Sequence, residues 1–176
     1  MTIFRNEQDK KRVEEEVTAL MSETFDDGRV WIFQGDPSRY DILHALTDPE
    51  LKEQHWQVNQ YRKVIKKMDI ALIWISGKDA GLYAVAEVIS NPAELSDYSA
   101  EEKYWINDAD RGKRRQKVAI KVKQCLVNNP VLRSELRNIG DLKGLSILNF
   151  SRGTNFPVRD REWVIIKSLI QERGYF

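Results

Sequence analysis

Runs of apolar residues divide the chain into candidate strands. Residues 70–75 and 82–89 are two such runs joined by a Gly-containing loop, which predicts a β-hairpin lying deep in a sheet. Residues 30–34 form a third run, β-branched and aromatic, that predicts a central strand. Residues 117–123 alternate with period two and predict a one-sided strand with its lysines facing outward. A final run at 145–150 predicts one more short strand.

Other segments place their apolar residues at helical spacing. Residues 6–22 carry one apolar stripe among Glu and Lys, which predicts an amphipathic N-terminal helix. Asp36 before Pro37 signals a helix over 37–46, and Asp48-Pro49 repeats the signal for a turn of helix before His55. The same reasoning predicts helices over 58–67, 130–139 and 158–173, with a capping-box spacing at 99–102. Strands and short helices without β-α-β alternation predict an α+β fold: a mixed, strongly curved sheet or small barrel surrounded by short helices.

Composition fits one globular domain of 176 residues, 41% hydrophobic and 31% charged. The net charge of +1 does not mark a nucleic-acid binder, so any such site must be local. No apolar run approaches the length of a membrane span and the N-terminus lacks a secretory signal, which predicts a soluble protein with no membrane partner. The single Cys125 excludes an internal disulfide and indicates a reducing, cytoplasmic setting.

Motifs for catalysis are absent from the sequence. It contains no phosphate-binding Gly-rich loop, no GxSxG and no HExxH. His55 is a candidate general base, but a lone loop histidine is more often a surface or hydrogen-bonded residue. Cys125 is more simply read as a small buried hydrophobe. With only His44 and His55, a zinc site would need carboxylate ligands. The sequence therefore predicts a protein without enzymatic activity, metal or cofactor.

Tryptophan is unusually frequent, with five in the chain. Trp31 and Trp74 lie within apolar runs and Trp163 on a helical stripe, which favours burial. Trp56 and Trp105 lie in polar surroundings, where packing does not explain them. Some of these indoles are therefore candidates for a stacking pocket.

A basic run follows the last of the polar tryptophans. Residues 111–123 contain seven Lys and Arg and no acid. Such a run is usually a solvated face, but in a nearly neutral chain it concentrates positive potential that suits a phosphate backbone. Aromatic side chains beside a basic strip indicate recognition of an unstacked base with support from backbone contacts.

Several segments together resemble the EVE domain, a member of the PUA-like superfamily. They are residues 55–69, 73–77 and 80–88, then Gly-Thr-Asn-Phe at 153–156 and Glu-Trp at 162–163. The resemblance implies an EVE domain over residues 29–176, with residues 1–28 forming an N-terminal helix that packs on it. Met68 departs from the family pattern, which often has Gly before the Asp, and this bears on the geometry of that turn.

The resemblance also implies a function. EVE domains are similar to YTH domains, which hold a methylated adenine in an aromatic cage, and they occur fused to nuclease or McrB-like restriction modules. A similar chain reads a modified base, 5-methylcytosine or 5-hydroxymethylcytosine in DNA, by flipping it into a cage, with a nuclease or restriction-type NTPase as effector. The resemblance implies base contacts by Trp56, Asn59, Gly35 and Asp36, with Trp105 as the opposing wall of the cage; the frequent tryptophans add Trp31 and Trp74 as base-binding candidates. The resemblance also implies contacts to the nucleic-acid backbone by Arg152, Thr154 and Asn155, and the basic run adds Arg111, Lys113, Arg114 and Arg115.

Three alternatives remain open from the sequence. An RNA-binding PUA-like domain is the second interpretation, since PUA-like folds commonly bind RNA and no residue in the sequence separates deoxyribose from ribose. A nucleotide-acting enzyme using His55 or Asp69 lacks a recognisable nucleophile. A protein-interaction module would use the amphipathic N-terminal helix, alone or as an additional role.

Overall fold

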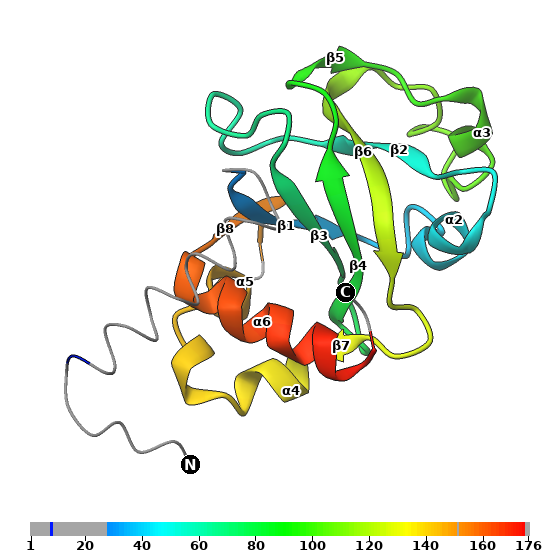
Figure 1. Ribbon diagram of the computed structural model, residues 1–176. Coiled ribbons are helices and arrows are strands. Elements are labelled where there is room, and N and C mark those ends of the chain that lie inside the picture. Colours follow the sequence, from blue (N-terminus) through cyan, green and yellow to red (C-terminus); the bar gives the residue numbers. More distant parts are fainter. Residues whose placement is uncertain (1–7, 9–27, 151, 175–176) are drawn as a thin grey trace.

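A single sheet with helices against it forms the molecule in the computed structural model, which describes residues 8, 28–150 and 152–174 (Figure 1). Short elements dominate, and among the described helices α6 alone exceeds two turns. In chain order the elements are β1 (Val30–Gly35), α2 (Ile42–Thr47), β2 (Glu53–Gln57), β3 (Ile70–Ile75), β4 (Gly81–Val88), β5 (Ala93–Leu95), α3 (Ser99–Glu102), β6 (Arg115–Cys125), β7 (Val131–Leu132), α4 (Arg133–Arg137), the 3-10 helix η1 (Gly140–Leu142), α5 (Ser146–Asn149), β8 (Asn155–Val158) and α6 (Asp160–Glu172).

The sheet has eight strands and is mixed. Its main path runs β2-β6-β4-β3-β1-β8, while β5 pairs with β6 and β7 pairs with β4. Strands β1 and β3 are parallel, and every other pairing is antiparallel. Register shifts at Ile73/Trp74 and at Val85/Ala86 interrupt the central ladders. Such irregularities bend strands, and the sheet is strongly curled.

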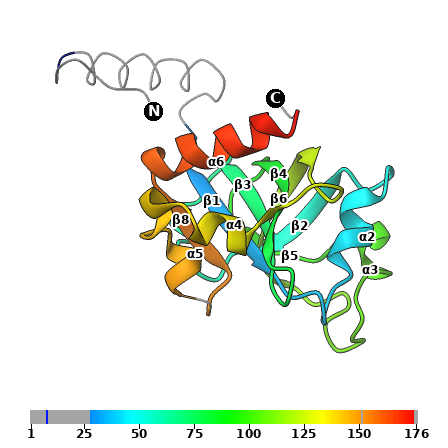
Figure 2. The ribbon, with the colours of Figure 1, turned by 90° about the horizontal axis from the view of Figure 1, so that it is seen from below.

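Both faces of the central strands are buried, which explains their near-continuous apolar sequences. In β3, Ile70, Leu72 and Trp74 belong to one core cluster while Ala71 and Ile73 belong to another. The first cluster includes side chains of α4, α5 and α6, and the second includes side chains of α2. Figure 2 shows α4, α5 and α6 on one side of the molecule and α2 on the other. The period-two alternation of a strand therefore divides one apolar run between two cores.

The hairpin, the strand at residues 30–34 and the closing helix are confirmed as β3–β4, β1 and α6. The strand predicted at 117–123 is confirmed within β6, and the helix at 130–139 is shortened to α4, preceded by β7.

Four local predictions are wrong. Residues 53–57 form the strand β2 rather than a loop after a turn of helix. Residues 145–150 contain the helix α5 rather than a strand, because a short apolar run fits either element. Residues 58–67 form turns instead of a helix. The helix predicted over 37–46 starts only at Ile42, after the N-cap Asp41.

Residues 6–22 lie outside the described part of the chain apart from Gln8, so the N-terminal helix and its packing stay predictions. Within the described ranges, no helix has both the length and the apolarity that crossing a membrane requires.

Candidate functional site

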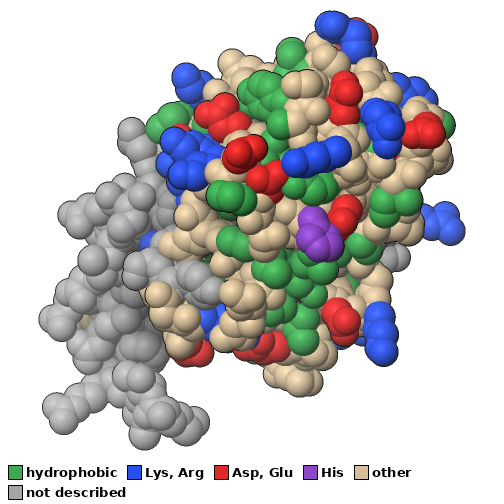
Figure 3. All heavy atoms as spheres, turned by 90° about the vertical axis from the view of Figure 1, so that its right-hand side faces the viewer, with side chains coloured by type: hydrophobic (Ala, Val, Ile, Leu, Met, Phe, Trp, Pro, Cys, Tyr) green, Lys and Arg blue, Asp and Glu red, His purple; other side chains and the backbone are tan. Residues whose placement is uncertain are grey.

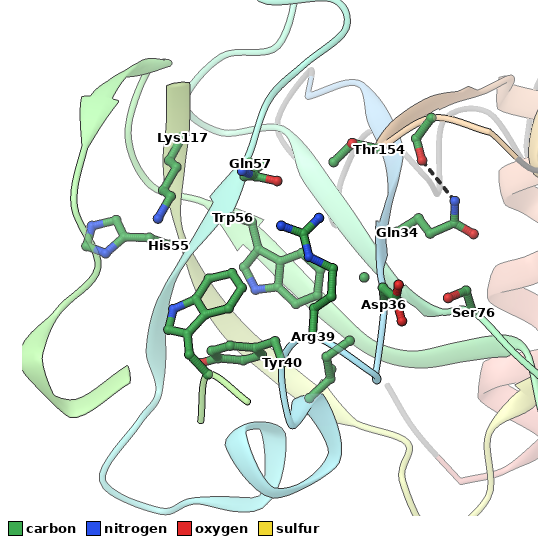
Figure 4. A pocket seen from close by; sticks show the side chains of 14 residues that line it. Gln34, Asp36, Arg39, Tyr40, His55, Trp56, Gln57, Ser76, Lys117 and Thr154 are labelled. Atoms are coloured by element: carbon green, nitrogen blue, oxygen red, sulfur yellow. Dashed lines mark hydrogen bonds between the residues drawn. The ribbon is translucent and has the colours of Figure 1, made fainter. Parts of the chain in front are cut away.

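A cavity of about 370 Å³ opens on the curled side of the sheet (Figure 4). Its walls come from the end of β1, the turn and helix start that follow it, strand β2, and single residues of later segments. The lining residues are Gln34, Gly35, Asp36, Arg39, Tyr40, Ile42, His55, Trp56, Gln57, Ser76, Trp105, Lys117, Gly153 and Thr154. Segments that lie far apart in the sequence therefore meet at one cavity.

Trp56 brings an indole to the cavity from strand β2. Its neighbours His55 and Gln57 also line the cavity, but Trp56 points into the second core cluster and is only 8% exposed. Its Nε1 donates to Gln54 Oε1 at 3.2 Å. A Cβ at Gly35 would lie 3.1 Å from this indole, so the glycine lets the ring rest against the backbone of β1. The ring is thus held in a single place by packing.

Trp105 brings a second indole, from the loop after α3. Its ring meets Tyr40 edge-on at 4.8 Å between centroids, and its Nε1 donates to Asp97 Oδ2 at 2.6 Å. The other oxygen of Asp97 accepts from Lys117 Nζ, also at 2.6 Å. Both side chains of this ion pair are only 2% exposed. A buried ion pair thus fixes the position of Trp105.

His55 is held by Glu101, the acid at the third position of helix α3. Its Nδ1 lies 2.9 Å from Glu101 Oε2, and its backbone N–H donates to Oε1 at 2.7 Å. Oε2 also accepts from the backbone N–H of Tyr98 at 2.8 Å. His55, Asp97 and Glu101 have ligand atoms within 4.8 Å of one another, as a metal site would. Every carboxylate oxygen in this set already accepts a hydrogen bond, however, which favours a structural role.

Asp110 joins two arginines beside the cavity. Arg39 donates through Nε and Nη2, at 3.2 and 2.7 Å, and Arg115 donates at 2.8 Å. The hydrogen bonds from Arg39 and the charges of both arginines hold the pKa of Asp110 below its usual range. The Arg39 guanidinium, which lines the cavity, is therefore fixed and its charge is partly neutralised.

A network of amides ties the segment before β8 to the chain after β2. Asn155 Oδ1 accepts from the backbone N–H groups of Asn59 and Gln60 at 2.8 and 3.2 Å, and its Nδ2 donates to Gln57 O. Asn59 Nδ2 donates to Thr154 Oγ1 at 2.7 Å. Asn155 is buried and both its amide oxygen and its amide nitrogen are hydrogen-bonded within the protein, which favours a structural role for this side chain.

The structure brings together most of the residues predicted to bind a base. Trp56, Trp105, Gly35 and Asp36 line the cavity, and Asn59 lies beside it through its bond to Thr154.

Two predicted base-binding tryptophans lie elsewhere. Trp31 and Trp74 are buried in the two core clusters and do not line the cavity, because their strands are covered on both faces. The Trp31 Nε1 donates to Oδ2 of the buried Asp69 at 2.8 Å, so the indole N–H is hydrogen-bonded within the protein.

The basic run is less free than its sequence indicates, because acids just before it and acids from other segments pair with its cations. Lys117, expected to point outward, is buried in its pair with Asp97. Ion pairs also join Arg111 to Asp108, Arg114 to Glu94, Arg115 to Asp110 and Lys123 to Glu87. Figure 3 accordingly shows Lys and Arg side chains interspersed with acids. Arg152 and Lys113, both exposed, have no ion pair among the described residues.

Sequence reasoning missed Arg39, Tyr40, Ser76 and Gln57 as cavity residues. Arg39 and Tyr40 lie outside the EVE-like segments, and Gln57 and Ser76 lie inside them but carry no chemical signal of their own; only the folding of distant segments onto one another places the four residues here. Burial, with nearby acidic charge, raises the pKa of Tyr40 far above its usual value, which keeps its hydroxyl neutral.

Comparison with solved structures finds the same fold in several proteins. A hypothetical protein from Leishmania major matches with a TM-score of 0.58 and 20% identity, over 85% of this chain and 99% of that one. The human THYN1 protein, solved in complex with DNA containing 5-methylcytosine, matches with a TM-score of 0.59 and 15% identity, over 81% and 97%. A mutant ZmASCH protein from Zymomonas mobilis matches at 0.52 and 12%, over 81% and 97%.

No curated protein sequence matches this chain significantly. The profile of the EVE domain matches residues 29–169, which is most of the chain and includes every segment that lines the cavity. The chain therefore belongs to the EVE domain family.

Proposed function

We propose that this chain binds nucleic acid and takes one modified base, 5-methylcytosine or 5-hydroxymethylcytosine in DNA, into the cavity lined by Trp56 and Trp105. The main support for this proposal is the cavity itself, a space of about 370 Å³ lined by two indoles from separate segments. That volume is at the lower end for small-molecule sites, which suits a single base. The binding of methylated DNA by the human neighbour of the same fold supports this choice of ligand.

Stacking would supply most of the affinity for the base. Each base stacked on an aromatic ring contributes about 1–3 kcal/mol, and contacts along the base edge decide its identity. The added methyl offers only about 1 kcal/mol of apolar burial, so we expect roughly fivefold preference over cytosine. Exposed Arg152 directly precedes the cavity residues Gly153 and Thr154, and we propose that it contacts a phosphate next to the bound base.

The proposed role is binding rather than catalysis. His55 is the titratable imidazole in the cavity wall, and its Nδ1 is engaged by Glu101. Among the described residues no Ser, Thr or Cys is hydrogen-bonded to that ring, so the base-nucleophile pair of a covalent mechanism is lacking. A nuclease or restriction-type NTPase that acts after binding remains a prediction.

A matched pair of variants tests the proposal. Trp56→Ala would open a large void in the second core cluster, at a cost of about 3–5 kcal/mol, so the milder Trp56→Phe is preferred. Trp74→Phe is the control, because it makes the same change outside the cavity. Dissociation constants are measured by fluorescence anisotropy for DNA and RNA oligonucleotides that differ only at one cytosine: unmodified, 5-methyl or 5-hydroxymethyl.

We expect the parent to prefer a modified DNA oligonucleotide. Trp56→Phe should raise the dissociation constant of that complex severalfold, and Trp74→Phe should leave the dissociation constant unchanged. The comparison uses variants whose melting temperatures are equal. The proposal fails if the parent binds all the oligonucleotides equally, or not at all. It also fails if the two variants bind alike. A preference for RNA would replace the DNA assignment with the RNA-binding alternative.

A further inference from the structure

Among the charged side chains that line the cavity, Asp36 differs from the others in its partners. Arg39 pairs with Asp110, Lys117 with Asp97 and His55 with Glu101, and each of these acids lies outside the cavity lining. For Asp36, no ion pair with another described residue is present. The wall of the cavity therefore contains three groups in ion pairs and one carboxylate, Asp36, that feels the charge of Arg39 but forms no ion pair with a described residue.

The carboxylate of Asp36 is oriented by its own turn. Oδ1 accepts from the backbone N–H of Ser38 at 2.9 Å and from its hydroxyl at 2.7 Å. These bonds lower the pKa of Asp36 below its ordinary value of 3.8, so it is ionised at neutral pH. An ionised carboxylate only accepts hydrogen bonds, and no described residue donates to Oδ2. One fixed acceptor is therefore left for a ligand.

The position of Asp36 suits the edge of a base rather than its face. Figure 4 places Asp36 and Ser76 at one side of the cavity, with His55 and Lys117 at the other and the Trp56 indole between them. A base stacked on that indole would turn its edge toward one of these sides. A carboxylate at a base edge accepts from an exocyclic amine, as Asp and Glu do with the cytosine 4-amino group.

Resting on the proposed function, we propose that Asp36 selects bases with an exocyclic amine, and so distinguishes 5-methylcytosine from thymine. The two bases have the same ring and the same methyl group, and they differ along the edge. Thymine has a carbonyl oxygen where 5-methylcytosine has the amine, and its one ring N–H is flanked by two carbonyl oxygens. Those oxygens would face the negative charge of Asp36 without a proton between them.

The test compares two single-stranded DNA oligonucleotides, identical except for 5-methylcytosine or thymine at one position. Single strands remove any difference in base pairing. We expect the parent to bind the 5-methylcytosine strand roughly 5- to 10-fold more tightly, at the low end for one edge contact because Asp36 is exposed at the rim. Asp36→Asn should bring the ratio close to one, since an amide can turn its NH₂ toward the thymine oxygen. Ser38→Ala keeps the carboxylate and should retain most of the preference.

The outcomes separate this inference from the function on which it rests. A parent that binds the 5-methylcytosine strand more tightly than unmodified cytosine, yet binds thymine equally well, overturns the role of Asp36 alone. Unchanged discrimination in Asp36→Asn does the same. A parent that binds no strand overturns the proposed function and the inference with it. Melting temperatures of both variants, expected to stay near that of the parent because Asp36 and Ser38 are exposed, exclude unfolding as the cause.

Discussion

The two sides of the sheet are held by different kinds of interaction. Beneath α4, α5 and α6 lies a cluster of aliphatic and aromatic side chains in which Leu72, Ile166 and Ile170 are fully buried. On the curled side, residues 96–114, here called the α3 loop, are attached to the sheet by acids. Asp97 forms an ion pair with Lys117, and Asp110 forms ion pairs with Arg39 and Arg115. Glu101 lies within hydrogen-bonding distance of His55.

This difference separates the requirements of the fold from those of the site. Apolar burial is non-directional, so the first side needs volume and patterning more than particular contacts. Buried ion pairs and charged hydrogen bonds are directional, and they fix where an indole or a guanidinium sits. The side with the cavity is thus the one whose side chains are positioned one by one.

Removing the acid that holds Trp105 should have the largest effect. Asp97→Ala leaves the Lys117 ammonium buried without its partner, and we expect a loss of about 3–5 kcal/mol in the free energy of unfolding. The double variant Asp97→Ala/Lys117→Met should lose less than Asp97→Ala alone, because it removes the uncompensated charge. Urea unfolding measures both. If the single and double variants lose the same free energy of unfolding, the stabilising role of Asp97 does not consist in neutralising the buried Lys117 charge.

On the opposite side, Leu72→Ala should cost about 2–5 kcal/mol through the void it leaves. Leu72→Met keeps the volume and should cost less than about 1.5 kcal/mol. The comparison between the two sides predicts a different result at Asp97. Asp97→Asn keeps the size of the side chain but removes its charge, so it should still destabilise the protein. If Leu72→Met destabilises the protein as much as Leu72→Ala does, the apolar side is as specific as the polar one.

Acid should weaken the α3 loop before it weakens the apolar core. Hydrogen bonds from Arg39 and the charges of Arg39 and Arg115 lower the pKa of Asp110 in the folded protein. Its stabilising contribution is therefore complete above the unfolded pKa, near 3.8, and is lost as the pH falls through the lower folded value. Asp110→Asn should be less stable than the parent at pH 7, and the difference between the two urea midpoints should vanish as the pH falls below the lowered pKa of Asp110 in the folded protein. A constant gap at all pH values would contradict this titration.

The smallest expected effect is a gain in stability at Met68. This residue has φ of 81° and a side chain that is 47% exposed, at the position where the EVE pattern often has glycine. Met68→Gly should therefore relieve backbone strain and stabilise the protein by about 0.5–1 kcal/mol. Tyr61 also has a positive φ, of 58°, but its ring packs 5.1 Å from that of Trp31, so Tyr61→Gly should not be stabilising. Thermal unfolding measures both variants: we expect the melting temperature to rise in Met68→Gly and to fall in Tyr61→Gly.

The sequence predicted the elements whose apolar pattern is local. Strands β1, β3 and β4 and helix α6 each show their periodicity within a single run. Strand β2 was missed because its sequence is almost wholly polar, and its inward residues are Gln54 and Trp56. Strand β8 was missed because it contains Pro157, which an edge strand tolerates.

The site was predictable only where a family motif or an unexplained aromatic marked it. Trp56 and Trp105 attracted attention because their neighbours in the sequence are polar, and both line the cavity. The partners that hold them were not predictable, since Asp97 reaches Lys117 twenty residues further along the chain. The run of cations at 111–123 is likewise largely paired, partly with distant acids such as Glu94 and Glu87 and partly with Asp108 and Asp110, which directly precede it.

The five indole N–H groups offer the most direct test of base binding in the cavity. Trp56 and Trp105 line it, whereas Trp31, Trp74 and Trp163 are buried in the core clusters without lining the cavity. In ¹H–¹⁵N NMR spectra assigned with single Trp→Phe variants, a DNA oligonucleotide containing one 5-methylcytosine is titrated into the parent protein. Our account predicts that the signals of Trp56 and Trp105 shift most, and shift less with the unmodified oligonucleotide at equal concentration. Shifts confined to other residues, or no shift of these two signals at saturation, would contradict it.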